Sequence, residues 1–231
     1  MKHIYKYYEQ LPVIRDFSMC FSARRIHCLF GPSGCGKTTL LNIIAGLTTF
    51  DKGIIQGISN KTFSYIFQEP RLLPWASVEE NVLFALESRY DKQKARQHIE
   101  KYLTLVDLLN FQKAYPKELS GGMRQRVSIA RAFAYDGDIV LMDEPFKELD
   151  FMLKKRLLDD IIKNWCGKKK HMIFVTHNID EALYLADEIH IFEGLPLTLK
   201  GQIVVDIPHD KREQEKKELQ RYKKEVEDMV N

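Results

Sequence analysis

Short apolar runs and helical stripes alternate along the chain, and their order predicts an α/β fold. Ile26–Phe30, residues 139–142 and His171–Thr176 are compact apolar or β-branched runs, as expected for buried strands. Helical patterns follow the first run at 39–47 and lie between the other two at 150–166. This alternation is typical of parallel strands that are joined by crossover helices.

The pattern differs before and within the middle of the chain. Residues 1–67 contain short strand and hairpin signals, with Gly53 and Gly57 as breakers, which predicts an N-terminal antiparallel β subdomain. Residues 68–134 are helical in pattern. Ser77 with Glu80 three positions later forms a capping-box signature for a helix over 78–88. A second helix is predicted over 91–109, with one apolar face made of Ile99, Tyr102, Leu103 and Val106.

The last segment, residues 210–231, is dense in charge but balanced in sign. Leu219, Tyr222, Val226 and Val230 are spaced to share one side of a helix. We expect a solvated C-terminal helix with a narrow docking stripe.

Composition narrows the class of protein. The 231 residues are 45% hydrophobic, enough for one large core, and the net charge of +3 gives no basic field that would require nucleic acid. No apolar run is long enough for a membrane span, and the N-terminus lacks the apolar core of a signal peptide. The four cysteines show no metal-ligand spacing, and Cys20 and Cys28 are predicted to be buried strand residues.

Residues 31–39, GPSGCGKTT, carry the strongest chemical signal. They fit the G-x-x-x-x-G-K-[ST] pattern between a predicted strand and a predicted helix, whereas a Gly-rich turn without function would not need this context. Glycines let backbone N–H groups curl around an anion at a helix N-terminus. Lys37 is expected to reach the β- and γ-phosphates of a nucleotide and the Thr38 hydroxyl to ligate Mg²⁺. The predicted phosphate-binding residues are Gly31, Pro32, Ser33, Gly34, Cys35, Gly36, Lys37, Thr38 and Thr39.

Two further motifs lie downstream. LSGGMRQR (119–126) precedes a helix expected to begin near Met123, and IVLMDEP (139–145) delivers Asp143 and Glu144 at a strand end. Open α/β sheets place ligands at that edge. Asp143 is therefore a candidate Mg²⁺ ligand, and Glu144 a candidate proton acceptor from the attacking water. The alternative for the acidic pair is a solvated turn or cap, and Ser120 could simply cap a helix.

Together, the phosphate loop, the LSGG segment, the acidic strand end and a later histidine resemble the ATP-binding cassette family over nearly the whole chain. The resemblance implies that Gln68 is a glutamine touching Mg²⁺ and the γ-phosphate side, that His177 contacts the γ-phosphate, and that Asp150 crosses to a second subunit. It also implies that Tyr8 stacks on adenine, with Tyr7 as the alternative. Ser120, Gly121 and Gly122 would close over the ATP of a second copy.

The resemblance also implies an organisation and a function. We expect a single ATPase domain over 1–231: a nucleotide-binding core (1–67 and 135–209), a helical subdomain (68–134) and the C-terminal helix (210–231). RLLPW, followed by NV, is similar to importer ATPases for nitrate, sulfonate, taurine and pyrimidine precursors. The expected protein is thus a homodimeric ATPase with ATP and Mg²⁺, at the cytoplasmic face of the membrane. Its partners would be a permease and, indirectly, an extracytoplasmic solute-binding protein.

Two departures from the family pattern and two rival functions remain. KELD (147–150) replaces a small-residue loop, and Arg24 and Arg25 occupy a turn where relatives generally have glycine.

A soluble cassette ATPase acting on nucleic acid or ribosomes is the first rival function, although the chain has neither a long coiled-coil insertion nor a second cassette. A small-molecule kinase is the second, and LSGG with His177 argues against it. The transported solute is chosen by other subunits.

Overall fold

The computed structural model describes residues 1–87, 89–165 and 170–230 in two compact units. The first unit is built from Met1–Lys61 and Ile162–Asn231, and the second from Thr62–Ile161. Both units mix helices with strands, and the predicted α/β class is confirmed. The predicted subdomain borders near residues 67 and 134 remain predictions. The predicted ends of three helices, at Ser88, Cys166 and Asn231, lie outside the described residues.

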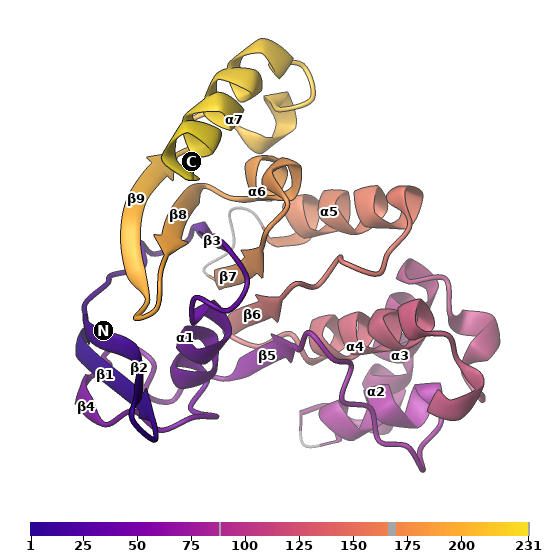
Figure 1. Cartoon of the computed structure of the whole chain (residues 1–231). Helices are drawn as coiled ribbons and strands as arrows, with labels where there is room; N and C mark the ends of the chain where they lie inside the picture. The colour runs from indigo at the N-terminus through magenta and orange to yellow at the C-terminus, as the bar shows by residue number, and fades with distance from the viewer. Residues whose placement is uncertain (88, 166–169, 231) are drawn as a thin grey trace. The chain divides into compact units, whose positions relative to one another are not determined.

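The N-terminal part of the first unit is a three-stranded antiparallel sheet, as the hairpin signals predicted. Its strands are β1 (Lys2–Tyr8), β2 (Leu11–Phe17) and β4 (Lys52–Ile54), in the order β2-β1-β4 (Figure 1). Ile4 of β1 and Ile14 of β2 are completely buried, while both ends of β1 (Lys2, His3, Tyr7 and Tyr8) are exposed. The sheet therefore has one packed face and one wet face.

A second sheet in the first unit carries the phosphate loop. β3 (Ile26–Phe30) pairs in parallel with β7 (His171–Thr176) on one side and with β8 (Glu188–Glu193) on the other. β9 (Thr198–Val204) adds an antiparallel strand to β8. Every residue of β3 is buried, which explains its continuous apolar pattern. The unit's main helices are α1 (Lys37–Ile44), α6 (Ile179–Leu185) and α7 (Lys216–Val230), and a short 3₁₀ turn covers His209–Lys211.

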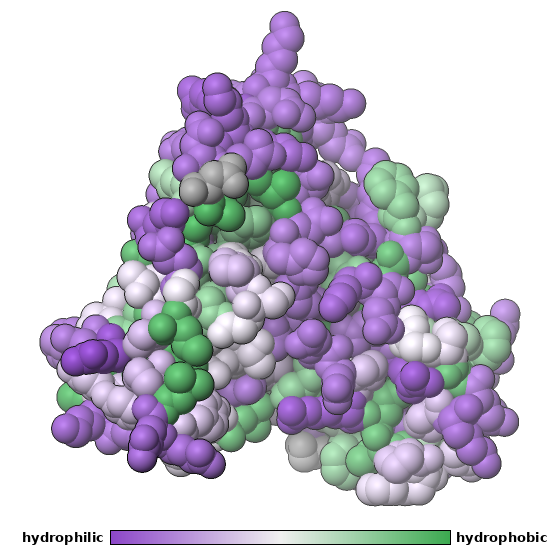
Figure 2. Space-filling model, viewed as in Figure 1, coloured by the Kyte–Doolittle hydropathy of each residue, from purple (hydrophilic) through white to green (hydrophobic). Residues whose placement is uncertain are grey.

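Helix α7 packs on α6, β8 and β9 through a narrow stripe (Figure 1). Tyr222 and Val226 are buried, but Val230 is 43% exposed, so the predicted stripe is shorter than its spacing indicated. Val230 is the last residue of α7, and the two buried members of the stripe lie one and two turns before it. The outward side of α7 is almost entirely hydrophilic in Figure 2, with hydrophobic side chains beneath it.

The second unit combines one parallel strand pair with four helices. β5 (Phe63–Ile66) pairs with β6 (Ile139–Asp143). α2 (Val78–Leu86) and α3 (Lys92–Leu105) pack against α4 (Gly121–Tyr135), and α5 (Phe151–Trp165) follows β6, with its last residues belonging to the first unit. Short 3₁₀ turns at Leu109–Phe111 and Pro116–Glu118 join α3 to α4.

Local signals fix the ends of these helices. The Ser77 hydroxyl accepts a hydrogen bond from the Glu80 N–H, and the Glu80 carboxylate accepts one from the Ser77 N–H, which completes the predicted capping box of α2. Helix α3 ends four residues before the predicted Leu109. The reason is Asp107, whose φ of +54° is a left-handed conformation that a helix cannot continue through.

One cysteine differs from its prediction. Cys28 is buried in β3 as expected, but Cys20 is exposed and lies in the loop between β2 and β3. The apolar residues around Cys20 produced a strand-like pattern, whereas the pairing of β2 ends at Phe17. Within the described residues, no helix combines the length and apolar character needed to cross a bilayer.

Candidate nucleotide site

The phosphate loop lies directly between β3 and α1 in the first unit. Gly31, Gly34 and Gly36 all have positive φ values, of +151°, +83° and +105°. Helix α1 starts at Lys37 with Gly36 as N-cap, and no side chain caps it. The first turn also contains no acidic residue. Its N–H groups and the positive end of the helix dipole are therefore presented to an anion instead of to a protein side chain.

Lys37 is the charged group of this loop, and it is 6% exposed. Its ammonium group donates hydrogen bonds to the carbonyl oxygens of Gly31 (2.9 Å) and Pro32 (2.6 Å). The Cys35 sulfur lies 3.6 Å from the same nitrogen. An ammonium group has three N–H donors, and two of them are used by these carbonyl oxygens. Sulfur is a weak acceptor, so a phosphate oxygen would displace the Cys35 sulfur from the third N–H. Cys35 is a buried free thiol that fills the loop.

The hydroxyl-bearing and aromatic candidates of the first unit lie at the surface. Thr38, in the first turn of α1, is exposed. Tyr8 is 47% exposed at the end of β1, with the Lys6 ammonium 4.9 Å from its ring centre, and Tyr7 is 38% exposed. Consecutive strand residues point to opposite faces, so only one of the two tyrosines can serve a given site.

His177 follows the C-terminal end of β7 and is exposed. The next residue, Asn178, caps α6: its side-chain oxygen accepts hydrogen bonds from the N–H groups of Asp180 (2.9 Å) and Glu181 (3.1 Å). His177 therefore lies between the strand end and the helix cap.

In the second unit, the other candidates gather at one sheet edge. Ile66 of β5 is paired with Met142 of β6. Gln68 and Glu144 each lie two residues beyond this pair, and parallel strands end at the same edge. Asp143 is 2% exposed at the end of a completely buried strand. Glu144 has a φ of +47°, a strained left-handed conformation of the kind that clusters at functional sites.

The LSGG segment begins α4. Ser120 is exposed and is the N-cap, accepting a hydrogen bond from the Met123 N–H at 3.2 Å. The helix starts at Gly121, two residues before the predicted start near Met123, because the two glycines continue it from the cap. Glu148 lies against both glycines: a Cβ on Gly121 would stand 2.9 Å from its carboxylate, and one on Gly122 3.0 Å from its carbonyl oxygen.

One residue of this site was missed by the sequence analysis. Gln125 is 3% exposed on α4, and its side-chain nitrogen lies 3.3 Å from the Pro145 carbonyl and 3.5 Å from that of Phe67. It thus joins the segment before Gln68 to the segment after Glu144. Its position within LSGGMRQR, one helical turn after Gly121, was the available signal. Asp150, by comparison, caps α5 through the Leu153 N–H at 3.0 Å.

The donor chemistry of these residues fits a nucleotide with its metal. Gly31 and Gly36 leave room that a Cβ would fill, since such an atom on Gly31 would collide with the Phe192 carbonyl and one on Gly36 would stand 3.1 Å from Val13. The first unit contributes a hydroxyl (Thr38), and the second unit by itself contributes an amide (Gln68) and a carboxylate (Asp143). Each is an oxygen donor of the type that Mg²⁺ prefers.

Comparisons with known proteins agree with this geometry. The family model described as "ABC transporter" matches residues 14–147. The "Aliphatic sulfonates import ATP-binding protein SsuB" of a Bacillus cereus strain is 45% identical over 189 residues, 78% of this chain and 74% of that protein. The protein of the same name from Bacillus subtilis (strain 168) is 41% identical over 191 residues, 80% of this chain and 74% of its own.

Solved structures are similar over most of the chain. A dimeric structure of MJ0796, described as a bacterial ABC transporter cassette, has a TM-score of 0.81 and 26% identity, covering 89% of this chain and 98% of that one. A dimeric post-hydrolysis state of the same cassette, bound to ADP and Pi, has a TM-score of 0.81 and 25% identity with the same coverage.

Proposed function

Because the chain belongs to the ABC transporter family, we propose that it is the ATP-hydrolysing subunit of a membrane importer and couples ATP-driven pairing of two copies to solute uptake. The family membership confirms the resemblance found in the sequence. The observation that carries the proposal is the uncapped N-terminus of α1, with the buried Lys37 ammonium held over the loop by Gly31 and Pro32. This is a site for a polyphosphate anion.

The proposal assigns the binding of the phosphates, the metal ion and the adenine to different groups of residues. The backbone N–H groups of residues 31–39 surround the β- and γ-phosphates, and Lys37 donates its third hydrogen to them. Thr38, Gln68 and Asp143 would hold Mg²⁺, which when bound neutralises charge on the β- and γ-phosphates. Tyr8 or Tyr7 stacks on adenine.

Hydrolysis requires a proton acceptor near the attacking water. Glu144 is that acceptor, because it follows the buried strand that ends in Asp143 and its strained backbone fixes the direction of its side chain. His177 orients the γ-phosphate and the water from the end of β7. Gln125 is a positioning residue that holds the backbone next to Gln68 and Glu144 in place.

A second copy of the chain completes the site. Ser120 is exposed and Gly121 and Gly122 are half-buried, and together they form a helix start whose N–H groups can close over the γ-phosphate held by the partner copy. ATP then becomes part of the interface between two chains, and its cleavage loosens them. The similarity to dimeric cassette structures supports this arrangement.

An apolar groove in the second unit fits the membrane partner. It has a volume of about 430 Å³ and is lined by residues that include Phe67, Arg71, Leu73, Phe84 and Tyr135. Phe84, one of the lining residues, is 65% exposed, and Trp75, which precedes α2, is 74% exposed. Large exposed aromatic side chains and an apolar groove are typical of a protein interface. We assign it to a helix of the permease, which would place the ATPase at the cytoplasmic face of the membrane.

The cargo is the least determined part of the proposal. Relatives named for aliphatic sulfonate import support an organic sulfonate or a similar small anion as the cargo. In this proposal an extracytoplasmic solute-binding protein delivers the cargo to the permease. The ATPase itself would not contact that cargo.

Glu144→Gln tests the hydrolytic role. The amide keeps the shape of the side chain but cannot accept the proton, so we expect ATP binding to persist, turnover to fall at least ~100-fold and an ATP-bound dimer to accumulate on a sizing column. Glu100→Gln, which changes an exposed carboxylate on α3, should leave turnover unchanged. Unchanged turnover in Glu144→Gln would remove this residue from its role. Failure of the wild type to pair with ATP and its permease would overturn the importer proposal.

A further inference from the structure

Three buried polar side chains meet between two neighbouring strands, away from the phosphate loop. His27 lies on β3, and Glu188 and His190 lie on β8, which is paired in parallel with β3 so that His27 is opposite Glu188. Glu188 and His190 are two positions apart and share a face of the strand. Their side chains, with that of His27, are only 0–5% exposed. Burial of such groups is costly unless they are hydrogen-bonded, paired or bound to a metal ion.

The three inward-facing atoms form a compact triangle. His27 Nδ1 lies 3.1 Å from His190 Nε2 and 3.5 Å from Glu188 Oε2, and His190 Nε2 lies 3.8 Å from the same oxygen. In a tetrahedral zinc site, nitrogen and oxygen ligands at about 2.0–2.2 Å from the ion are separated by about 3.3–3.5 Å. An ion near the centre of this triangle would therefore have bonds of about 2 Å to all three atoms.

The proton on His27 is assigned by its other contact. His27 Nε2 lies 2.9 Å from the Ser22 carbonyl oxygen, which can only accept, so Nε2 carries the hydrogen and Nδ1 presents a lone pair. That lone pair faces the carboxylate of Glu188. If His190 Nε2 carries a hydrogen, it can donate that hydrogen to the lone pair of His27 Nδ1. Glu188 Oε2 then still faces the same His27 lone pair at 3.5 Å. A cation between the three atoms satisfies all of them at once, and a histidine that donates its second N–H to a backbone carbonyl is the usual form of a metal ligand.

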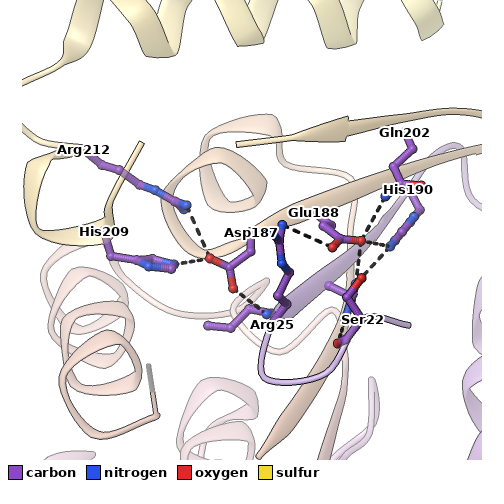
Figure 3. A network of polar contacts seen from close by, with 10 residues as sticks. Ser22, Arg25, Asp187, Glu188, His190, Gln202, His209 and Arg212 are labelled. Atoms are coloured by element: carbon purple, nitrogen blue, oxygen red, sulfur yellow. Dashed lines mark hydrogen bonds and ion pairs between the residues drawn. The ribbon is translucent and has the colours of Figure 1, made fainter. Parts of the chain in front are cut away.

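The surroundings hold the ligands in place. Glu188 Oε2 accepts a hydrogen bond from Gln202 at 2.9 Å, and its other oxygen lies 3.3 Å from Arg25, as Figure 3 shows. The Phe21 ring meets the His27 ring edge-on, with centres 5.0 Å apart.

One charge opposes a cation here. Arg25 is positive, but it lies against the Glu188 oxygen that points away from the triangle, and its side chain is 43% exposed, so water screens it. Among the described residues, this is the one group of three or more histidine, cysteine or acidic side chains whose potential ligand atoms all lie within 4.8 Å of one another.

We propose that His27, Glu188 and His190 bind one Zn²⁺-type transition-metal ion that ties β3 to β8. Two imidazole nitrogens and one carboxylate oxygen favour Zn²⁺ and its neighbours, whereas Mg²⁺ and Ca²⁺ prefer oxygen ligands alone. This site is separate from the nucleotide site and does not depend on the proposed function. Because His27 lies four residues before Gly31 on the same strand, the ion would fix the strand from which the phosphate loop leaves.

The test uses the full chain without an affinity tag or nucleotide, stripped of metal by a chelator. Equilibrium dialysis against Zn²⁺ should give one ion per chain, and Zn²⁺ in hundredfold excess over its dissociation constant should raise Tm by roughly 5 °C. His190→Val and Glu188→Gln should each weaken binding at least tenfold. The matched control is His209→Gln, because His209 is also an imidazole of this unit, only 14% exposed, but lies on the opposite side of the Asp187–Glu188 pair (Figure 3).

Two results of the Zn²⁺ experiments would overturn the proposal. One is a wild-type chain that takes up no Zn²⁺ at micromolar concentration, and the other is unchanged stoichiometry and affinity in a folded His190→Val protein. Co²⁺ offers a measurement that needs no variant: the wild type should show the strong visible absorption of a low-coordinate Co²⁺ site with nitrogen ligands. The weak spectrum of hydrated Co²⁺ would equally reject the site.

Discussion

The carbonyl oxygen of Phe192 occupies the space where a Cβ atom would stand on Gly31. Phe192 belongs to β8, the neighbour of the strand that leads into the phosphate loop. Gly31 also has a φ of +151°, so both space and backbone conformation require glycine at this point.

Gly31→Ala should therefore lower the free energy of unfolding by at least about 2 kcal/mol and abolish nucleotide binding. Gly34→Ala separates the two causes, because Gly34 has a φ of +83° but nothing within 4 Å of its Cβ position. We expect it to cost only about 1 kcal/mol, from backbone strain. Urea unfolding of both variants measures the difference, and equal losses would show that the Phe192 contact is unimportant.

Lys37→Met should weaken nucleotide binding without unfolding the chain. The methionine retains most of the apolar stem, while the hydrogen bonds to Gly31 and Pro32 and the charge for phosphate are lost. Charge-assisted hydrogen bonds are worth about 1.5–3 kcal/mol, so affinity for ATP should fall roughly 10- to 150-fold. Fluorescent nucleotide titration measures this loss. Affinity within threefold of the wild type would contradict the assignment of Lys37.

Glu148→Ala should strengthen ATP-driven pairing. The Glu148 carboxylate lies against Gly121, at the helix start that is proposed to receive the partner copy's γ-phosphate, and two negative groups there repel each other. The side chain is exposed, so we expect only a two- to fivefold gain in dimer affinity. Sizing or light scattering with ATP in a Glu144→Gln background measures it. The gain should shrink at high salt, and weaker pairing would reject the idea.

Acid should destabilise the chain through His209. Its pKa is lowered by burial first and by Arg212 second, against the opposing effects of Asp187, Asp210 and a hydrogen bond to the Leu185 carbonyl. The unfolded chain therefore binds this proton below about pH 6.5, where the folded chain does not. Stability should fall by up to about 1.4 kcal/mol per pH unit as the pH drops below that value.

His209→Gln keeps a donor for the Leu185 carbonyl but cannot titrate. Its unfolding free energy should vary less steeply between pH 6.5 and 5 than that of the wild type, as measured by urea unfolding at each pH. Parallel curves for the two proteins would show that His209 is not the group responsible.

Ser77→Ala removes one half of the capping box of α2. The hydroxyl's hydrogen bond to the Glu80 N–H, 3.3 Å long, is lost, while the bond from the Ser77 N–H to the Glu80 carboxylate (2.7 Å) can persist. We expect a loss of about 0.5–1 kcal/mol, and Ser77→Asp should restore most of it. Denaturation midpoints of the three proteins provide the comparison, and an unchanged midpoint in Ser77→Ala would mean that the cap contributes nothing.

Much of this protein was determined locally by its sequence. The buried strands β3 and β7, the capping box at Ser77 and the glycine-rich start of α1 depend on neighbouring residues, so their patterns predicted them. The motif order identified the family for the same reason, because each motif is a short local segment at the start of a helix or the end of a strand, with a fixed chemistry.

Only the tertiary structure decided which distant residues meet. Gln125 links two strand ends, Phe192 excludes any side chain at Gly31, and His27 faces His190 across 163 positions of sequence. Cys20 is exposed although its neighbours look like a strand, because β2 loses its partner at Phe17. Such pairings follow from strand order and register, which hydrogen bonds between remote segments set and no local pattern records.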